Sequence, residues 1–420
     1  MNRLGSISLV SSCLLLLLTH CVDQQSSALK ALAGKGYSLS VPEFFKAAAA
    51  GDAAVLKLFI EAGVELDVRD KDGRQALNHA ARAGSPEGIE ALVNLGATVP
   101  QHSSLLLSDA VRSHAMPSLQ ALLDLKVKPD ADPRDSPLST AASENQREMI
   151  EALLPLCLGH LDNALLAAAA QGDISVVSTL MRAGASVFIR DAVTQRTPLM
   201  EAAGHGDVKV VTMLLDSGAN RWAVDAEGFT TAEKAEAALH ADLARDLRKP
   251  PTEEERRVAP SIKGKSFALR PEFLDKQLFF TGCRETLLPF MLVTSEVDTA
   301  TVQLAGEQQE VKLALGAPVP SSLWKLERLK PEGAIFRKGD TTEHLLLVPG
   351  LPARHGPLVA VIQDDSTKQT YEAAAGDMFN SETDPALKLS VKAVSPHEVR
   401  ITDNNSPARE WILHLGGRRW

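Results

Sequence analysis

The stretch DAVTQRTPLMEAAGHGDVKVVTMLLDSGA, residues 191–219, carries the clearest structural signal in the chain. Thr197 is suited to the start of a helix, because its hydroxyl can accept a hydrogen bond from a free backbone N–H group. Pro198 follows at the first helical position, where its missing N–H group is harmless. Paired alanines, a Gly-Asp dipeptide, a second apolar run and a final Gly-Ala complete the pattern. The stretch therefore predicts two short helices that pack closely against each other.

The same frame recurs between residues 43 and 248, at steps of 33, 30, 31, 27, 34 and 33 residues. Each copy is followed by a second run with apolar residues at helical spacing. The repetition predicts a stack of helix pairs, because one pair alone cannot bury its apolar face. The short step of 27 predicts a truncated connection before residue 165. One aligned column holds Phe44, Leu77, Leu107, Leu138, Leu165 and Leu199, with Ala232 in a weaker copy.

These residues resemble the ankyrin repeat, which is a turn followed by two antiparallel helices and has a period of about 33 residues. The resemblance covers residues 41–248 and implies an N-terminal α-solenoid of about six to seven repeats. It also implies that the array binds proteins through the turns between repeats, called fingers, and through the ends of the first helix of each pair, called the inner helix. A different solenoid built from helix pairs is the alternative.

Carried over position by position, the resemblance implies a set of partner-binding residues. Arginine and tryptophan are favoured anchors at protein interfaces. The alternative is that the arginines are solvated and the aromatic residues pack between fingers. The implied residues are Arg69, Lys71, Arg74, Arg82, Arg190, Gln195, Arg196, His205, Val224 and Phe229, with Phe188 and Trp222 adding aromatic surface. We expect recognition chiefly at Arg190, Arg196, His205 and Trp222.

Residues 249–264 break the helical pattern with prolines and a run of charges, which predicts a linker whose backbone lacks packing partners. Residues 265–420 then alternate apolar and polar side chains between turn residues, a pattern typical of antiparallel β structure. Gly316 and Gly376, 60 residues apart, and Pro331 and Pro396, 65 apart, lie between similar strands. This spacing predicts a duplication, with two tandem β modules at about 265–345 and 346–420. The predicted fold class is multidomain α + β.

The N-terminus reads MNRLGSISLVSSCLLLLLTHC, with a basic residue at Arg3 and an apolar core from Leu9 to Leu18. This core is too short to span a bilayer, which needs about 20 apolar residues. It fits an export signal at residues 1–20. No later segment is long and apolar enough to be a transmembrane helix. A buried N-terminal helix is the alternative.

Leu18-Thr19-His20-Cys21 resembles the lipobox of bacterial lipoproteins, with His20 where that family prefers Gly or Ala. The resemblance implies lipidation at Cys21, a tether over residues 21–40, and an extracytoplasmic location in the periplasm or cell envelope, anchored to a membrane. Simple cleavage and release is the alternative.

The formal charge of −9 argues against a nucleic-acid partner, which needs a positive field. The four cysteines cannot form a dense disulfide framework, and a Cys157–Cys283 disulfide is not expected. No nucleophile or metal motif is present, and the histidines are scattered, so we expect no cofactor and no metal site. The sequence favours a non-catalytic, protein-binding scaffold. One alternative is an envelope enzyme with its site in the β region, for which the array provides specificity; another is a structural spacer.

Overall fold

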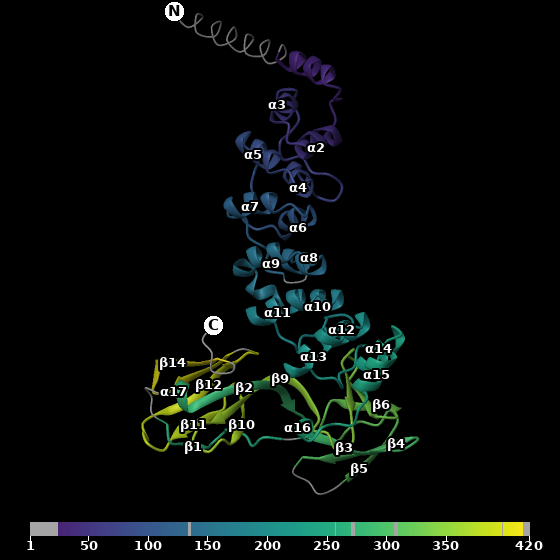
Figure 1. Cartoon of the computed structure of the whole chain (residues 1–420), viewed down its shortest axis with the longest axis vertical. Coiled ribbons are helices and arrows are strands. Elements are labelled where there is room, and N and C mark those ends of the chain that lie inside the picture. Colours follow the sequence, from purple (N-terminus) through teal and green to yellow (C-terminus); the bar gives the residue numbers. More distant parts are fainter. Residues whose placement is uncertain are drawn as a thin grey trace, which may run out of the picture. The chain divides into compact units, whose positions relative to one another are not determined.

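The computed structural model describes residues 24–132, 136–256, 258–269, 274–305, 310–396 and 398–414 (Figure 1). The predicted export signal and Cys21 lie outside the described residues. The chain divides into two compact units, Met1–His160 and Leu161–Trp420.

Helix pairs build the first unit, where they follow one another along the chain (Figure 1). The predicted column of large apolar residues is buried in these pairs, and so are alanines such as Ala80 and Ala81. Polar side chains start several helices, because Asp52, Ser85 and Ser103 accept hydrogen bonds from backbone N–H groups three residues ahead. The pairs are α2 (Val41–Ala50) and α3 (Ala53–Glu61), α4 (Ala76–Arg82) and α5 (Pro86–Asn94), α6 (Ser104–Arg112) and α7 (Met116–Asp124), and α8 (Pro137–Ser143) and α9 (Arg147–Leu153).

The predicted tether is wrong over residues 24–34, which form a helix. Ala28 and Leu32 lie four residues apart, so they share one face of this helix, and both are buried. The side-chain amide of Gln25 donates a hydrogen bond of 2.9 Å to the carbonyl of Ala62, just after α3. The hydrogen bond ties this segment to the end of α3, and its two apolar side chains are buried.

The second unit begins with three more pairs: α10 (Leu161–Gln171) and α11 (Ile174–Ala183), α12 (Pro198–His205) and α13 (Val208–Asp216), and α14 (Thr231–Ala237) and α15 (Ala241–Leu247). In the stretch 191–219 the Thr197 hydroxyl accepts a hydrogen bond from the N–H of Met200, and Ala202 and Ala203 are fully buried. Residues before α10 form two short 3₁₀ turns, η1 (Leu154–Leu156) and η2 (Leu158–His160), in place of a full finger. The truncated connection is therefore confirmed.

The predicted free linker is wrong, because residues 249–264 are held by long-range partners. The guanidinium of Arg221 donates to both carboxylate oxygens of Glu255, at 2.7 and 2.9 Å. It also donates to three backbone carbonyls between residues 247 and 250. Glu255 lies in a short helix, α16 (Glu253–Arg256), and Ile262 is fully buried. No local sequence pattern reveals a partner 34 residues away.

Two apolar cores organise the β region. The inserted module, residues 290–353, has one core between two three-stranded sheets. The outer module combines residues 262–287 with 354–414 around a second core. The inserted module contains β3 (Phe290–Ser295), β4 (Thr299–Leu304), β5 (Glu310–Ala314), β6 (Trp324–Lys330), β7 (Gly333–Lys338) and β8 (His344–Leu347). The outer module contains β1 (Ser266–Phe267), α17 (Leu274–Gln277), β2 (Leu278–Leu287), β9 (Arg354–Asp364), β10 (Thr370–Ala374), β11 (Met378–Ser381), β12 (Lys388–Val394), β13 (Glu398–Asp403) and β14 (Ser406–His414).

The two modules are nested, which corrects the predicted tandem boundaries. Strand β2 pairs antiparallel with β9, from Leu278 opposite Asp364 to Leu287 opposite Arg354. The whole inserted module therefore lies between β2 and β9, the second and third strands of the outer module. Pairing between strands so far apart leaves no local signal in the sequence.

The duplication itself stays a prediction, but the two modules share local features. Gly316 and Gly376 both adopt positive φ, 81° and 91°. Their N–H groups donate hydrogen bonds of the same length, 2.7 Å, to Leu326 and Val391. A register shift follows each acceptor, before Arg328 in one module and before Ala393 in the other. The two modules therefore share one strand plan, in which β3 corresponds to β2.

Candidate protein-binding surfaces

Trp222, predicted to contact a partner, packs inside the second unit. Its exposed fraction is 7%, and it forms an apolar cluster with Val224, Ile335, Leu346 and Val348. The assignment of Trp222 and Val224 to an accessible binding surface is therefore corrected. Both side chains face the inserted module, and neither of the two sequence-based interpretations of Trp222 anticipated that neighbour.

The inserted module supplies this contact through the second face of one of its sheets. Successive side chains of a strand point to opposite faces. Ala334 and Phe336 of β7 lie in the core of the inserted module, whereas Ile335 lies in the cluster with Trp222. In β8, Leu345 and Leu347 belong to the module core and Leu346 to the Trp222 cluster. The β6–β7–β8 sheet is thus covered on both faces.

Charged groups lie beside the Trp222 cluster. Lys330 of β6 forms an ion pair with Glu233 of α14. Burial opposes ionisation of Glu233, but hydrogen bonds from Lys330 and Thr230 outweigh it and lower the pKa of this carboxyl. Phe229 is 42% exposed and lies beneath the ammonium groups of Lys234 and Lys330, 4.8 and 6.0 Å from its ring centre.

Arg190 is also engaged within the second unit. Its guanidinium donates a hydrogen bond of 3.0 Å to the carbonyl of Val224. It also acts electrostatically on Glu285 of β2. Burial raises the pKa of Glu285, against the opposing charges of Arg190 and His355 and a hydrogen bond from Asn220. Arg190 thus lies near the contact between the last repeats and the β region. We call this contact, centred on Trp222, the joint.

Three members of the predicted set stay accessible in the last repeats. Arg196 is 40% exposed and lies 3.6 Å from the carboxylate of Glu201. His205 is exposed at the end of α12, and its ring packs on the bare backbone of Gly172, where a Cβ would fall 2.4 Å from the ring. Phe229 is the third. Of these three residues, Phe229 lies next to the β region, through Lys330 of β6.

In the first unit, the predicted finger at residues 69–74 is built around Asp70. Its carboxylate accepts hydrogen bonds from the backbone N–H groups of Asp72 and Arg74, at 2.8 and 2.9 Å. Burial opposes the ionised form, but these bonds and one from His79 together outweigh it and lower the pKa of Asp70. Arg69 donates to the carbonyl of Gly73 at 2.8 Å, so its guanidinium shapes the finger.

An open groove of about 600 Å³ lies between α2 and this finger, and we call it the Phe45 groove. The ring of Phe45 stacks on the imidazole of His79, with ring centres 4.3 Å apart and an interplanar angle of 10°. His79 in turn lies 3.0 Å from the carboxylate of Asp70. The lining residues are Val41, Pro42, Phe45, Lys46 and Ala49 from α2, Asp70 and Lys71 from the finger, and His79 from α4.

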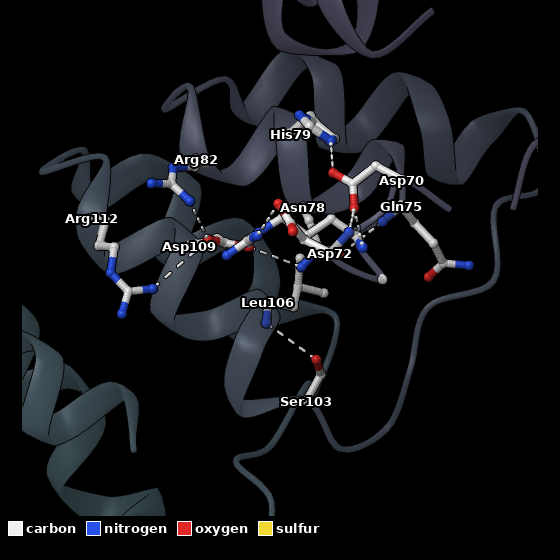
Figure 2. A network of polar contacts seen from close by, with 12 residues as sticks. Asp70, Asp72, Gln75, Asn78, His79, Arg82, Ser103, Leu106, Asp109 and Arg112 are labelled. Atoms are coloured by element: carbon white, nitrogen blue, oxygen red, sulfur yellow. Dashed lines mark hydrogen bonds and ion pairs between the residues drawn. The ribbon is translucent and has the colours of Figure 1, made fainter. Parts of the chain in front are cut away.

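A cluster of charged side chains lies next to the groove on α4 and α6 (Figure 2). Asp109 is fully buried, and one of its carboxylate oxygens accepts hydrogen bonds of 3.1 Å from Arg74 and from Asn78. The other oxygen lies 3.5 Å from the guanidinium of Arg82 and 3.9 Å from that of Arg112. We call these five residues the Asp109 cluster. Arg74, predicted as a partner contact, is committed to this carboxylate.

Three guanidinium groups surround the Asp109 carboxylate, and that of Arg74 also lies 3.5 Å from the carboxylate of Asp72. Arg74 is 18% exposed, whereas Arg82 and Arg112 are 52% and 39% exposed. Sequence reasoning found Arg82 but missed Asp109 and Arg112. The available signal was an aspartate within the apolar inner helix SLLLSDAVR, because a buried charge requires partners.

The described residues contain no group of three or more His, Cys, Asp or Glu side chains that could hold a metal ion. Within the same ranges, no single helix is long and apolar enough to cross a membrane.

Comparison with known proteins agrees with the repeat pattern. The family description "Ankyrin repeats (3 copies)" matches residues 44–135, 138–225 and 165–249. Two similar solved structures are the human ASB11 ankyrin repeat domain (26% identity, TM-score 0.43, 50% of this chain and 99% of that one) and the Bcl-3 ankyrin repeat domain (23% identity, TM-score 0.38, 48% and 97%). No curated protein matches the chain. The β region is not recognised, and the helical region of this chain belongs to the ankyrin-repeat family, a protein–protein interaction module.

Proposed function

We propose that this chain is an exported, lipid-anchored and non-catalytic adaptor of the bacterial cell envelope. Its first repeats bind a protein partner through the Phe45 groove, and its last repeats hold its own β region. The observation that carries this proposal is the burial of Trp222 against the inserted module, which commits part of the last repeats to the chain itself. The Phe45 groove in the first unit is open and lined by both apolar and charged side chains.

The N-terminal sequence supports the anchor. Lipidation at Cys21 would place the acyl chains three residues before the helix at residues 24–34. Three residues span at most about 10 Å of extended chain. The packed helix therefore shortens the predicted tether and brings the first helix pair close to the membrane surface. Several acyl chains on one cysteine would anchor the protein durably.

The cysteine environments support a non-catalytic role. Burial raises the pKa of Cys157 and of Cys283 to about 12, so both thiols stay protonated at neutral pH. The guanidinium of Arg284, which follows Cys283 in the chain, lies 3.9 Å from the carboxylate of Glu372. An enzyme in the β region would need another nucleophile.

Two experiments test the proposal. In cells, radiolabelled fatty acid should label the wild type and not Cys21→Ala; equal labelling of both, or of neither, would contradict the anchor.

For the binding face, a photo-crosslinking amino acid replaces Lys71 at the groove rim or, as a control, Lys57 on the outer helix α3, where the lysine is 67% exposed. We expect an intermolecular adduct from position 71 and none from position 57. Adducts of the same pattern from both positions, or from neither, would refute binding at the groove.

A further inference from the structure

Building on the proposed function, we infer that the partner presents a short acidic segment with one apolar anchor residue. The anchor fills the Phe45 groove, and acidic side chains beside it pair with Arg82 and Arg112. The ligand class is thus an acidic, hydrophobically anchored peptide.

The groove provides a site for the apolar anchor. Its floor is the stacked pair of Phe45 and His79, and Val41, Pro42 and Ala49 add aliphatic surface. The ring of His79 is fixed from two sides, by Phe45 and by the carboxylate of Asp70. A rigid, preformed apolar site loses little entropy on binding. Side chains of aromatic or large aliphatic residues match this surface.

The Asp109 cluster provides the charge. Arg74 makes the firm contact to Asp109, a hydrogen bond of 3.1 Å from Nε. Arg82 and Arg112 each reach the same carboxylate with one terminal nitrogen, at 3.5 and 3.9 Å. A guanidinium group carries five N–H donors in a planar fork. The two outer arginines therefore have donors and exposed area for a second carboxylate.

The two parts adjoin each other. His79 and Arg82 lie three residues apart on α4, so they share one face of that helix. The finger links the same two parts, because Asp70 contacts His79 while the backbone N–H of Arg74 donates to Asp70. Figure 2 shows the Asp70–His79 pair beside the Asp109 cluster. A residue in the groove would thus place its neighbours within reach of Arg82.

The positive charge around the groove favours an acidic peptide as the ligand. The rim adds the exposed Lys71 and the ammonium group of Lys46, whose side chain is 69% exposed and which lies 3.6 Å from the carboxylate of Glu43. These positive groups stand out on a chain with a formal charge of −9. A nucleic acid would meet repulsion from the rest of this chain, whereas a short peptide contacts only the local positive surface.

The test first selects, from a random library of short displayed peptides, those that bind the detergent-solubilised full-length chain. We expect enriched peptides with Asp or Glu next to an aromatic or large aliphatic residue. A synthetic peptide of the enriched sequence is then titrated by fluorescence anisotropy against three proteins. These are the wild type, Arg82→Gln/Arg112→Gln, and the control Lys57→Gln/Arg147→Gln, which removes the same charge from the outer helices α3 and α9. Arg74 is left intact, because Asp109 depends on it.

The Arg82→Gln/Arg112→Gln variant should bind about tenfold more weakly and lose most of its salt dependence, while the control stays at the wild-type value. Enrichment of neutral or basic peptides, or equal losses in both variants, would overturn the inference. So would an oligonucleotide that competes with the peptide and binds through the same arginines. A crosslink at Lys71 in cells together with non-acidic peptides would refute this inference and leave the proposed function intact. Absence of both crosslink and peptides would refute both.

Discussion

The first and last repeats of this chain follow one sequence pattern but use their inner surfaces differently. In the first unit, Arg82 and Arg112 keep much of their surface exposed beside an open groove. In the second unit, Trp222 packs against the β region of the same chain, and Arg190 acts electrostatically on Glu285 of β2. A family resemblance therefore identifies an interaction surface without showing whether its occupant is another protein or a later part of the same chain.

The largest expected effect is on the joint in the second unit. Trp222→Ala should destabilise the unit by about 3–5 kcal/mol, because it removes a large buried side chain and leaves a cavity. Phe229→Ala, at a position 42% exposed, should cost far less. Denaturant unfolding of both variants measures the difference. Equal losses would mean that Trp222 does not pack on the inserted module.

A smaller loss is expected in the Asp109 cluster. Arg74→Ala removes a charged hydrogen bond to a fully buried carboxylate and should cost about 2 kcal/mol. Arg82→Ala removes an exposed pair and should cost less than about 1 kcal/mol. Thermal unfolding of the two variants would rank them, and the reverse order would show that Arg82, not Arg74, is the structural partner of Asp109.

The two glutamates at the joint should respond oppositely to pH. The pKa of Glu233 is lowered by folding, so its stabilising contribution is present above the unfolded value of about 4.3 and is lost as pH falls through the folded pKa. The pKa of Glu285 is raised, so its contribution is complete below the unfolded value and is lost as pH rises through the folded pKa.

At pH 7, Glu233→Gln should therefore lower stability by on the order of 1 kcal/mol, whereas Glu285→Gln should match or exceed the wild type. Melting curves from acidic to neutral pH test this pair. A uniform loss of stability in Glu285→Gln across that range would mean that folding does not raise the pKa of Glu285.

The smallest effect concerns local accessibility. Arg221 holds the backbone at residues 247–250, so limited proteolysis of the native chain should spare residues 249–264. Arg221→Ala should open this segment to cleavage with only local loss of structure. Rapid cleavage there in the wild type would support the unpacked linker that the sequence predicts.

Local patterns allowed much of the fold to be predicted. Thr197, Pro198 and the alanine pairs predict the helix pairs because caps and close packing depend on residues near in sequence. The nested modules could not be predicted, since β2 finds its partner β9 beyond the whole inserted module. The buried contact between the last repeats and the β region is partly visible in the sequence. Residues 345–348 read LLLV, an unbroken apolar run typical of a strand covered on both faces.

The candidate groove was only partly predictable for a related reason. The finger residues Arg69, Lys71 and Arg74 follow from the repeat pattern, but their exposure does not. Whether an arginine is free or bound to a buried aspartate depends on the neighbouring repeat, as Arg74 and Asp109, 35 residues apart, show.

The most direct test compares one photo-crosslinking residue at two positions of the full-length chain in cells. At position 71 we predict an adduct with another protein. In place of Trp222, the same residue should crosslink within the chain, to the peptide that contains Leu346 and Val348. An intermolecular adduct from position 222, or an intramolecular product at position 71 with no partner attached, would contradict the division of the repeats into a partner-binding part and a part that holds the β region.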